Sequence, residues 1–256
     1  MFSQAIVRRP SANFENGLTT AGLGSPYYTR ALAQHADYCS ALEQCGLKLT
    51  YLPLDEIHPD STFVEDTAIV TERFAVVARP GAPSRLGEVS SMNDALAAFY
   101  STVYSIDEPG TLDGGDVCQA GNHFFIGISA RTNEAGAQQL SEVVASFNYS
   151  ASFMDIRHLN GLLHLKSGMA YLGGNRLVAI DILAHEEGFC DYNVLFVPES
   201  EKYAANCVRV NDHVLIAAGY PALETSLRHW GYEPLSLDMS EFRKMDGGLS
   251  CLSVRF

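Results

Sequence analysis

The chain has 256 residues, of which 17 are Lys or Arg and 30 are Asp or Glu, so its net charge is −13 with His neutral. This charge argues against nucleic acid and anionic membranes as partners and is compatible with a small cationic ligand. The length allows a large buried core, and no Pro/Ser-rich linker or change of composition divides the chain. We therefore expect a single catalytic domain over residues 1–256.

The cellular compartment is indicated by the N-terminus and the cysteines. Residues 1–10 lack the apolar segment of a signal peptide, and no apolar run reaches membrane length, so we expect a cytoplasmic protein. None of the six cysteines stands in a Cys-x-x-Cys pair, which disfavours a zinc site and a redox motif. We expect these cysteines to be reduced.

The first predicted elements are a strand and a loop. Ile6 and Val7 indicate the strand, and residues 16–26, with three glycines, predict a loop. Such a loop either closes over a site or is an ordinary surface connection, and the residues alone leave both possibilities open.

A helix is predicted over residues 29–45, where apolar residues keep helical spacing and Gly46 follows as a stop. His35 and Cys39 lie on the apolar face of this helix. We expect both side chains to pack in the core rather than to act in chemistry.

The rest of the chain repeats one order of events, in which a short polar stretch leads into two neighbouring strands that a helix follows. The predicted strands lie at residues 63–70 and 74–77, at 112–117 and 124–126, at 169–172 and 177–180, and at 205–208 and 214–216. The first helix is predicted from Val89, Met92, Leu96, Phe99 and Val103, the second from residues 137–147, and the last between Pro221 and Gly231, whereas the helix after residue 180 is poorly marked.

A polar or thiol side chain stands at the same point of each unit. These residues are separated by 47, 51, 43 and 44 positions and are Asp66, Asp113, His164, Cys207 and Cys251. A period in this range normally indicates a solenoid or a propeller, and closure of the units into a ring would bring these side chains to one axis. An ordinary α/β sheet with scattered polar residues is the alternative.

The residue types at these points suit covalent chemistry on a guanidinium group. This planar cation resists attack because attack destroys its resonance, so a strong nucleophile such as the Cys251 thiolate is needed. Asp66 and Asp113 can hold its N–H groups in charge-assisted hydrogen bonds. His164 can protonate the departing amine and then activate water, with Asp113 orienting the imidazole. We also expect nearby carboxylates to raise the pKa of the Cys251 thiol and a bound cation to lower it again.

Each of these features also has a simpler interpretation. Cys251 could be a small buried hydrophobe, His164 a hydrogen-bonded core histidine, and the acids of residues 113–116 parts of a tight turn. Arg85 and Arg131 are favoured as solvated surface groups on residue type alone; their functional alternative is a bidentate contact with a substrate carboxylate.

Several motifs, in order, make the chain resemble the dimethylarginine dimethylaminohydrolase family. They are Phe63-Val-Glu-Asp66, Arg79-Pro-Gly-Ala-Pro-Ser-Arg85, Leu112-Asp-Gly-Gly-Asp-Val117, Ala130-Arg-Thr-Asn133, Leu163-His-Leu-Lys166, Ala205-Asn-Cys207 and Met245-Asp-Gly-Gly-Leu-Ser-Cys251. The resemblance implies the pentein fold, a five-bladed α/β propeller of ββαβ units. It also implies a guanidine-modifying hydrolase, a dimethylargininase, that converts asymmetric dimethylarginine or monomethylarginine to citrulline and dimethylamine or methylamine without a cofactor or metal.

The resemblance also assigns roles to ten residues. It implies Cys251 as the nucleophile, which forms a covalent thiouronium intermediate, His164 as the general acid and base, and Asp113, a position that is Glu in some relatives, as the acid supporting His164. For substrate binding it implies Asp66 at the guanidinium with Glu65 and Asp246 nearby, Arg85 and Arg131 at the α-carboxylate, and the Leu18 backbone with the Asp60 side chain at the α-amino group.

Alternative functions remain open at this point. Arginine deiminases resemble this chain in fold but carry an acid two residues after the catalytic histidine, where this chain has Lys166, which favours an N-methylated substrate. An amidinotransferase is disfavoured by the short chain. A non-catalytic ligand-binding module of the same fold, or one in which Cys251 and His164 bind a metal, is the alternative from another class. The expected partner is a small cationic substrate, and the expected assembly is a monomer or homodimer.

Overall fold

Five three-stranded sheets make up the computed structural model, which describes residues 1–183 and 187–256. In each sheet the first strand pairs antiparallel with the second, and the second pairs parallel with a third strand that comes later in the chain. Inner strands of neighbouring sheets contact one another, as β15 does β3 and as β9 does β6 and β12. The expected five-bladed propeller of ββαβ units is therefore confirmed.

The strands are short, and each blade uses three of them. They are β3 (Ala68–Val70), β4 (Ala75–Val77) and β5 (Val103–Ser105); β6 (Val117–Ala120), β7 (His123–Ile128) and β8 (Ser150–Asp155); β9 (Met169–Gly173), β10 (Arg176–Ile180) and β11 (Asn193–Val197); β12 (Val208–Val210), β13 (His213–Ala217) and β14 (Glu233–Leu237); and β15 (Val254–Arg255), β1 (Gln4–Val7) and β2 (Lys48–Tyr51).

The last blade joins the two ends of the chain. Strand β15 pairs antiparallel with β1, with Ile6 opposite Val254, and β1 pairs parallel with β2. The backbone N–H groups of Ser3 and Gln4 both donate to the carbonyl oxygen of Phe256, at 2.9 and 2.8 Å. Since the final strand completes the sheet that the first strand begins, this pairing closes the ring.

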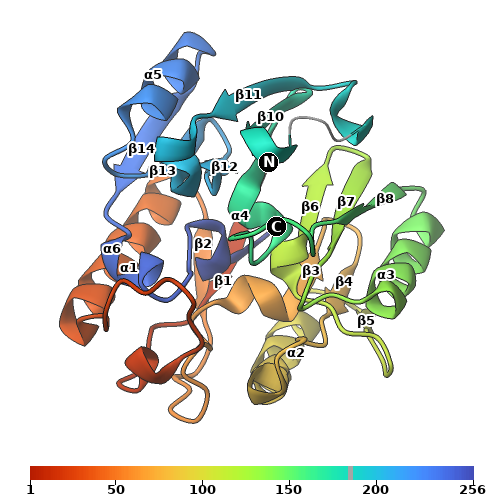
Figure 1. Ribbon diagram of the computed structural model, residues 1–256. Coiled ribbons are helices and arrows are strands. Elements are labelled where there is room, and N and C mark those ends of the chain that lie inside the picture. The colour runs from red at the N-terminus through yellow and green to blue at the C-terminus, as the bar shows by residue number, and fades with distance from the viewer. Residues whose placement is uncertain (184–186) are drawn as a thin grey trace.

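The longer helices lie on the periphery of the ring, as Figure 1 shows. They are α1 (Tyr28–Gln44), α2 (Val89–Ala97), α3 (Glu134–Ser146) and α5 (Pro221–His229), and two single-turn helices are α4 (Leu165–Gly168) and α6 (Ser240–Arg243). The blade of β9, β10 and β11 has 3-10 turns at Asp181–Leu183 and Glu187–Phe189, and its poorly marked helix falls partly on residues 184–186, outside the described residues. Every helix in the described part of the chain is too short or too polar to cross a bilayer.

Apolar residues at helical spacing pack each outer helix on its sheet. Leu140 and Val144 of α3 are buried against Phe124 and Ile126 of β7. The side chain of Asn133 accepts a hydrogen bond from the Gly136 N–H at 2.8 Å and so caps the N-terminus of this helix.

The helix predicted over residues 29–45 is confirmed as α1, and its two chemically notable side chains lie in the core. His35 and Cys39 are buried, and the Cys39 sulfur lies 3.6 Å from Nδ1 of His35. Burial lowers the pKa of His35 to about 4, so this imidazole is neutral at physiological pH.

Several predicted boundaries are wrong. The helix predicted as far as Val103 ends at Ala97, because Val103 pairs with Ala75 as the first residue of β5 and the chain must turn to reach it. The strands predicted from residues 63, 112 and 205 begin only at Ala68, Val117 and Val208, because a short helical turn precedes each strand. In each case apolar residues continued a pattern across a change of backbone conformation.

A short helical turn precedes the first strand of every blade, and we call these segments the entry turns. They are Val64–Thr67, Gly114–Asp116, Leu165–Gly168, Glu199–Ala205 and Ser250–Leu252. The polar stretches of the repeat fall on or directly beside them. Contacts between Val64–Thr67 and both Gly114–Asp116 and Ser250–Leu252 show that the entry turns meet around the axis.

A cavity of about 600 Å³ lies at the other end of the inner strands. It is lined by residues of β3, β6, β9, β12 and β15 and by their hairpin turns, including Gly121 and Asn211. Toward the entry turns it is bounded by Glu65, Lys166 and Ser250. Since Cys251 and His164 are not among its lining residues, this cavity is distinct from the candidate active site.

Candidate active site

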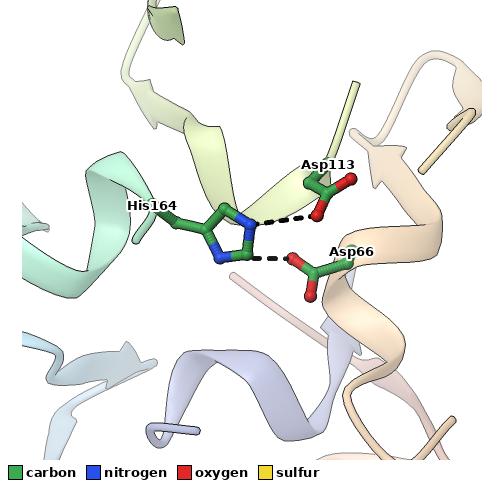
Figure 2. A group of neighbouring side chains, drawn as sticks. All are labelled: Asp66, Asp113 and His164. Carbon is green, nitrogen blue, oxygen red and sulfur yellow. Dashed lines mark hydrogen bonds and ion pairs between the residues drawn. The ribbon is translucent and has the colours of Figure 1, made fainter. Parts of the chain in front are cut away.

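Two acids and an imidazole from three blades converge at the entry turns. One carboxylate oxygen each of Asp66 and Asp113 and one ring nitrogen of His164 all lie within 4.8 Å of one another, and all three residues are buried. Figure 2 shows the three side chains. They are separated by 47 and 51 positions along the chain, so only closure of the ring brings them together.

Asp113 fixes the orientation of the His164 ring. Oδ2 of Asp113 lies 3.0 Å from Nε2 of His164, as Figure 2 shows. Oδ1 of the same carboxylate accepts a hydrogen bond from the Gly81 N–H at 2.8 Å, and the Asp113 N–H donates to Oγ1 of Thr132 at 3.1 Å. The carboxylate is therefore held at both oxygens, and Nδ1 is the ring nitrogen that remains for chemistry.

The surrounding acids favour the charged imidazolium. Burial opposes the charge, but the carboxylates of Asp66, Asp116 and Asp113 outweigh it and raise the pKa of His164 to about 9. At neutral pH the His164 side chain therefore carries a proton that it can give to a leaving group.

Asp66 is held as an anion on the other side of the ring. Its Oδ1 lies 3.9 Å from Nδ1 of His164 and accepts from the Gly115 N–H at 2.9 Å, while Oδ2 accepts from Nη1 of Arg85 at 2.6 Å. Burial opposes the negative charge, yet His164 and Arg85 lower the pKa of Asp66 to about 2. A Cβ on Gly115 would lie 2.7 Å from Oδ1 of Asp66 and 2.8 Å from Nδ1 of His164, so only glycine fits here.

Cys251 lies in the entry turn Ser250–Leu252, which contacts the Asp66 turn, and its side chain is buried. Its sulfur accepts a hydrogen bond from the Gly248 N–H at 3.5 Å. Burial, followed by the charges of Glu65 and Asp66, raises the pKa of the thiol to about 12, against the opposing effects of Gly248 and Lys166. The expected rise is confirmed, with burial as its larger cause, and the lowering by a bound cation stays a prediction.

Glu65 is already paired by basic side chains. Its Oε1 lies 2.7 Å from Nζ of Lys166 and 3.4 Å from Nη2 of Arg255, and its Oε2 accepts a hydrogen bond from Oγ of Ser250 at 2.6 Å. Lys166 thus neutralises an acid next to the turn of Cys251. Glu65 has little acceptor capacity left for a substrate.

The two predicted carboxylate-binding arginines differ. Arg85 is buried, which overturns its interpretation as a surface group, and it donates to Asp66, to Glu88 and to the carbonyl oxygen of Phe63. Within the described residues, no hydrogen bond or ion pair engages the guanidinium of Arg131, which is half-buried. Burial raises the pKa of Asp60, and the nearby charge of Arg131 is among the effects that oppose this rise. Arg131 is therefore the arginine available to an anionic ligand.

The loop at residues 16–26 is attached to the site by two predicted acids. The Leu18 N–H donates to both oxygens of Asp60, each at 3.1 Å. Oδ2 of Asp246 accepts from the N–H and the hydroxyl of Thr20, at 2.5 and 3.0 Å. Leu18 and Asp60 are brought together as predicted, whereas Asp246 holds the loop in this structure.

Asp116 is a buried acid that the sequence reasoning did not assign. Its Oδ1 accepts from the Leu165 N–H, next to His164, and its Oδ2 accepts from the hydroxyls of Ser129 and Thr132, at 2.6 and 2.7 Å. Burial raises its pKa to about 6. The Oγ1 of Thr132 also accepts a hydrogen bond from the Asp113 N–H. Asp116 therefore connects the backbone next to His164 to the backbone of Asp113. The signal in the sequence that could have identified Asp116 is its position within the motif Leu112-Asp-Gly-Gly-Asp-Val117.

The cluster of Asp66, Asp113 and His164 could in principle hold a metal ion. The carboxylates are, however, already hydrogen-bonded: Asp66 to Arg85 and Gly115, and Asp113 to Gly81 and His164. These contacts fit proton transfer by His164 better than metal binding.

Comparisons with known proteins identify the family. No protein-family model matches the chain. The N(G),N(G)-dimethylarginine dimethylaminohydrolase of Pseudomonas aeruginosa is 44% identical over 257 residues and 100% of both chains, and that of Streptomyces coelicolor is 35% identical over 255 residues, covering 98% of this chain and 96% of the relative.

Solved structures agree with these relatives. The structure of a mutant of the P. aeruginosa enzyme complexed with citrulline superposes with a TM-score of 0.97 at 43% identity over 100% of both chains. An adduct of a variant dimethylarginine dimethylaminohydrolase with S-methyl-L-thiocitrulline superposes with a TM-score of 0.96 over the same coverage. The ring of five blades is thus the pentein fold, and this chain belongs to the dimethylarginine dimethylaminohydrolase family.

Proposed function

We propose that this protein hydrolyses N-omega-methylated arginine, asymmetric dimethylarginine or monomethylarginine, to citrulline and dimethylamine or methylamine. The observation that carries the proposal is the convergence of Asp66, Asp113 and His164 beside the turn of Cys251, in a chain 44% identical over its whole length to an enzyme of that name. The citrulline complex of that relative supports the product.

In this mechanism the substrate guanidinium binds against Asp66 and lowers the pKa of the Cys251 thiol by adding a positive charge. The thiol releases its proton to solvent, and the thiolate forms a bond to the central guanidinium carbon. The C–N bond to the methylated nitrogen then breaks while Nδ1 of His164 gives that nitrogen a proton, which leaves a covalent thiouronium on Cys251.

Hydrolysis of the adduct reverses these roles. The neutral His164 takes one proton from an attacking water, and the oxygen bonds to the same carbon. The C–S bond then breaks, and the second proton of the water passes from the oxygen to the departing sulfur, which releases citrulline and regenerates the thiol. Asp113 keeps the imidazole oriented through Nε2 in both halves, a geometry supported by the 3.0 Å contact. No step calls for a metal or another cofactor.

The remaining contacts place the amino-acid part of the substrate. Arg131 binds the α-carboxylate, while Leu18 and Asp60 receive the α-amino group. Arg85 is buried and donates to Asp66, so it acts through that carboxylate. The Lys166–Glu65 pair supports a methylated substrate over arginine, because it withdraws an acid from the guanidinium end.

We infer a single catalytic unit over residues 1–256 that acts as a monomer or homodimer. A cytoplasmic location is supported by the buried free thiols of Cys39, Cys45, Cys118, Cys207 and Cys251.

A citrulline assay tests the proposed function. Wild-type protein is given asymmetric dimethylarginine, monomethylarginine, arginine and agmatine, and the product is read from its ureido group, because agmatine gives a carbamoylated amine and not citrulline. Cys251→Ser is measured beside the matched control Cys118→Ala, another buried free thiol. We expect citrulline from the methylarginines, a loss on the order of 10³-fold or more in Cys251→Ser, and activity retained in Cys118→Ala. Citrulline from arginine alone would point to a deiminase, and no product from any substrate to a binding module.

A further inference from the structure

The blade of β12, β13 and β14 supplies none of the reacting groups proposed above, yet it places one polar side chain among the entry turns. Asn206 directly follows the Glu199–Ala205 entry turn and is 5% exposed. The next residue, Cys207, packs in the apolar core with Ala204 and Ala205. Asn206, rather than Cys207, is therefore the polar residue that this blade presents toward the site.

The side-chain amide of Asn206 makes its hydrogen bonds to two other entry turns. Its Oδ1 accepts from the Ser250 N–H at 2.9 Å, and its Nδ2 donates to Oγ of Ser250 at 2.9 Å and to the carbonyl oxygen of Lys166 at 2.8 Å. Ser250 precedes Cys251, and Lys166 lies two residues after His164. One buried side chain thus connects the turn of the thiol to the turn of the imidazole.

The neighbouring charges fix the direction of these hydrogen bonds. The Ser250 hydroxyl accepts from Asn206 and donates to Oε2 of Glu65, while Lys166 holds Oε1 of the same carboxylate. Four side chains from four blades therefore form one saturated network behind Cys251. A network with every member satisfied holds its backbone more rigidly than isolated hydrogen bonds do.

Asn206 also packs directly on the segment that donates to the nucleophile. A Cβ on Gly248 would lie only 2.4 Å from Oδ1 of Asn206, so the amide rests against the Gly248 backbone. The Gly248 N–H is the group that donates to the Cys251 sulfur at 3.5 Å. Asn206 therefore contacts Gly248, which carries this donor, and Ser250, which directly precedes Cys251.

We propose that Asn206 is a positioning residue for the nucleophile, which acts by holding the Ser250–Leu252 turn and the Gly248 N–H against the Cys251 sulfur. The inference rests on the proposed function for its effect on turnover, but the reactivity of Cys251 can be measured without turnover. Neither the family motifs nor the repeat assigned Asn206 a role.

The experiment compares Asn206→Ala with Asn133→Ala in the full-length protein. Asn133 is the matched control because its side chain also makes three hydrogen bonds, in this case to the backbone of Thr111, Pro109 and Gly136, away from the turn of Cys251. The readouts are the rate at which iodoacetamide alkylates Cys251 across neutral to alkaline pH, followed on the Cys251 peptide by mass spectrometry, and kcat and KM on asymmetric dimethylarginine.

Asn206→Ala is expected to slow alkylation and to lower kcat on the order of 10- to 100-fold with a nearly unchanged KM, because a displaced donor no longer supports the thiolate. Asn133→Ala should lose stability but keep the wild-type alkylation profile. Wild-type alkylation and kcat in Asn206→Ala, at a similar loss of stability, would overturn the proposal and leave Asn206 a structural residue.

Ser250→Ala is the second variant in case Asn206→Ala does not fold. It removes only the hydroxyl and keeps the bond from the Ser250 N–H to Asn206, so a smaller slowing of alkylation in the same direction is expected; an unchanged rate would overturn the proposal. Absence of wild-type turnover with slow alkylation in the variants would reject the proposed function while upholding the role of Asn206.

Discussion

Arg85 and Arg131 have the same side chain and were predicted to do the same work, but the structure gives them different partners. The guanidinium of Arg85 donates hydrogen bonds to Asp66, Glu88 and a backbone carbonyl. Among the described residues, none forms a hydrogen bond or ion pair with the guanidinium of Arg131. Because burial and partners differ, we expect truncation of the two arginines to affect different kinetic parameters.

Arg131→Met is expected to raise KM for asymmetric dimethylarginine by about 10- to 100-fold, the loss of a charge-assisted contact worth about 1.5–3 kcal/mol, with a smaller change in kcat. The contact is formed equally in the ground state and the transition state, so binding suffers more than chemistry. Steady-state kinetics on this substrate and on an N-methylated guanidine without the carboxylate would check this. Equal losses on both substrates would contradict the assignment.

Arg85→Met serves as the contrasting variant. It leaves the buried carboxylates of Asp66 and Glu88 without their cation, which typically costs about 3–5 kcal/mol of unfolding free energy. We expect a lower denaturant midpoint and a reduced kcat, whichever substrate is used. A variant of normal stability with only a raised KM would show that Arg85 is chiefly a carboxylate ligand.

The elements that matter most to the site are the entry turns and the loops that touch them. Gly81 illustrates why glycine is needed there: its N–H donates to Asp113, and a Cβ would lie 2.1 Å from the carbonyl oxygen of Arg131. Two loops therefore cross in backbone contact at the point where they fix the acid behind His164.

Gly81→Ala should force these loops apart, at a cost of about 1–3 kcal/mol of stability, and lower kcat because Asp113 loses its anchor. Gly174→Ala is the matched control, since Gly174 has φ +58° but a Cβ there would meet no atom within 4 Å, so only backbone strain is added. Thermal unfolding and citrulline formation measured on both variants would test whether Gly81 anchors Asp113. Normal kcat in Gly81→Ala would disprove the anchoring role.

The inner strand pairs were predictable and the outer strands were not. Residues 169–172 and 177–180, for example, carry apolar runs because both strands are largely buried. By contrast, β2 and β8 are mostly exposed or half-buried, and no strand was assigned to either from the sequence. Strands at the rim are specified by pairing with β1 and β7 rather than by their own pattern.

For the whole molecule, the acids gathered at the axis couple stability to pH. His164 has a pKa of about 9 in the fold against 6.5 in the unfolded chain, so its protonation stabilises the fold fully below pH 6.5, and this contribution is lost as pH rises through 9. The difference corresponds to about 3 kcal/mol. In this window the Cys251 thiol stays protonated in the fold.

We therefore expect the unfolding free energy of the wild type to fall between pH 6.5 and 9, measured by urea denaturation at a series of pH values. His164→Gln cannot titrate and should have a flatter profile, although it is less stable at the acidic end because its acids lose their cation. Parallel profiles for the two proteins would contradict the raised pKa of His164.

The chain alone determined the number of units, because side chains with similar surroundings recur at separations of 43 to 51 residues, and it identified the thiol, the imidazole and the acids within recognisable motifs. These local patterns can be seen in the sequence because turns and buried strands limit which residue types can occur in them. Even Asn206 and Asp116 lay inside motifs that had been singled out, without any sign of what they contact.

Only the tertiary structure decided which groups meet. The pairing of β15 with β1 closes the ring, and the packing of the blades around one axis brings Asp66 to His164, Asp116 to Leu165 and Asn206 to Ser250 across 98, 49 and 44 positions of chain. The three-dimensional surroundings also decide that Arg85 is paired with Asp66 while Arg131 is left available to a ligand. They raise the pKa values of His164 and Cys251 as well. Charge and hydrogen bonding depend on distance in space, which no spacing along the chain records.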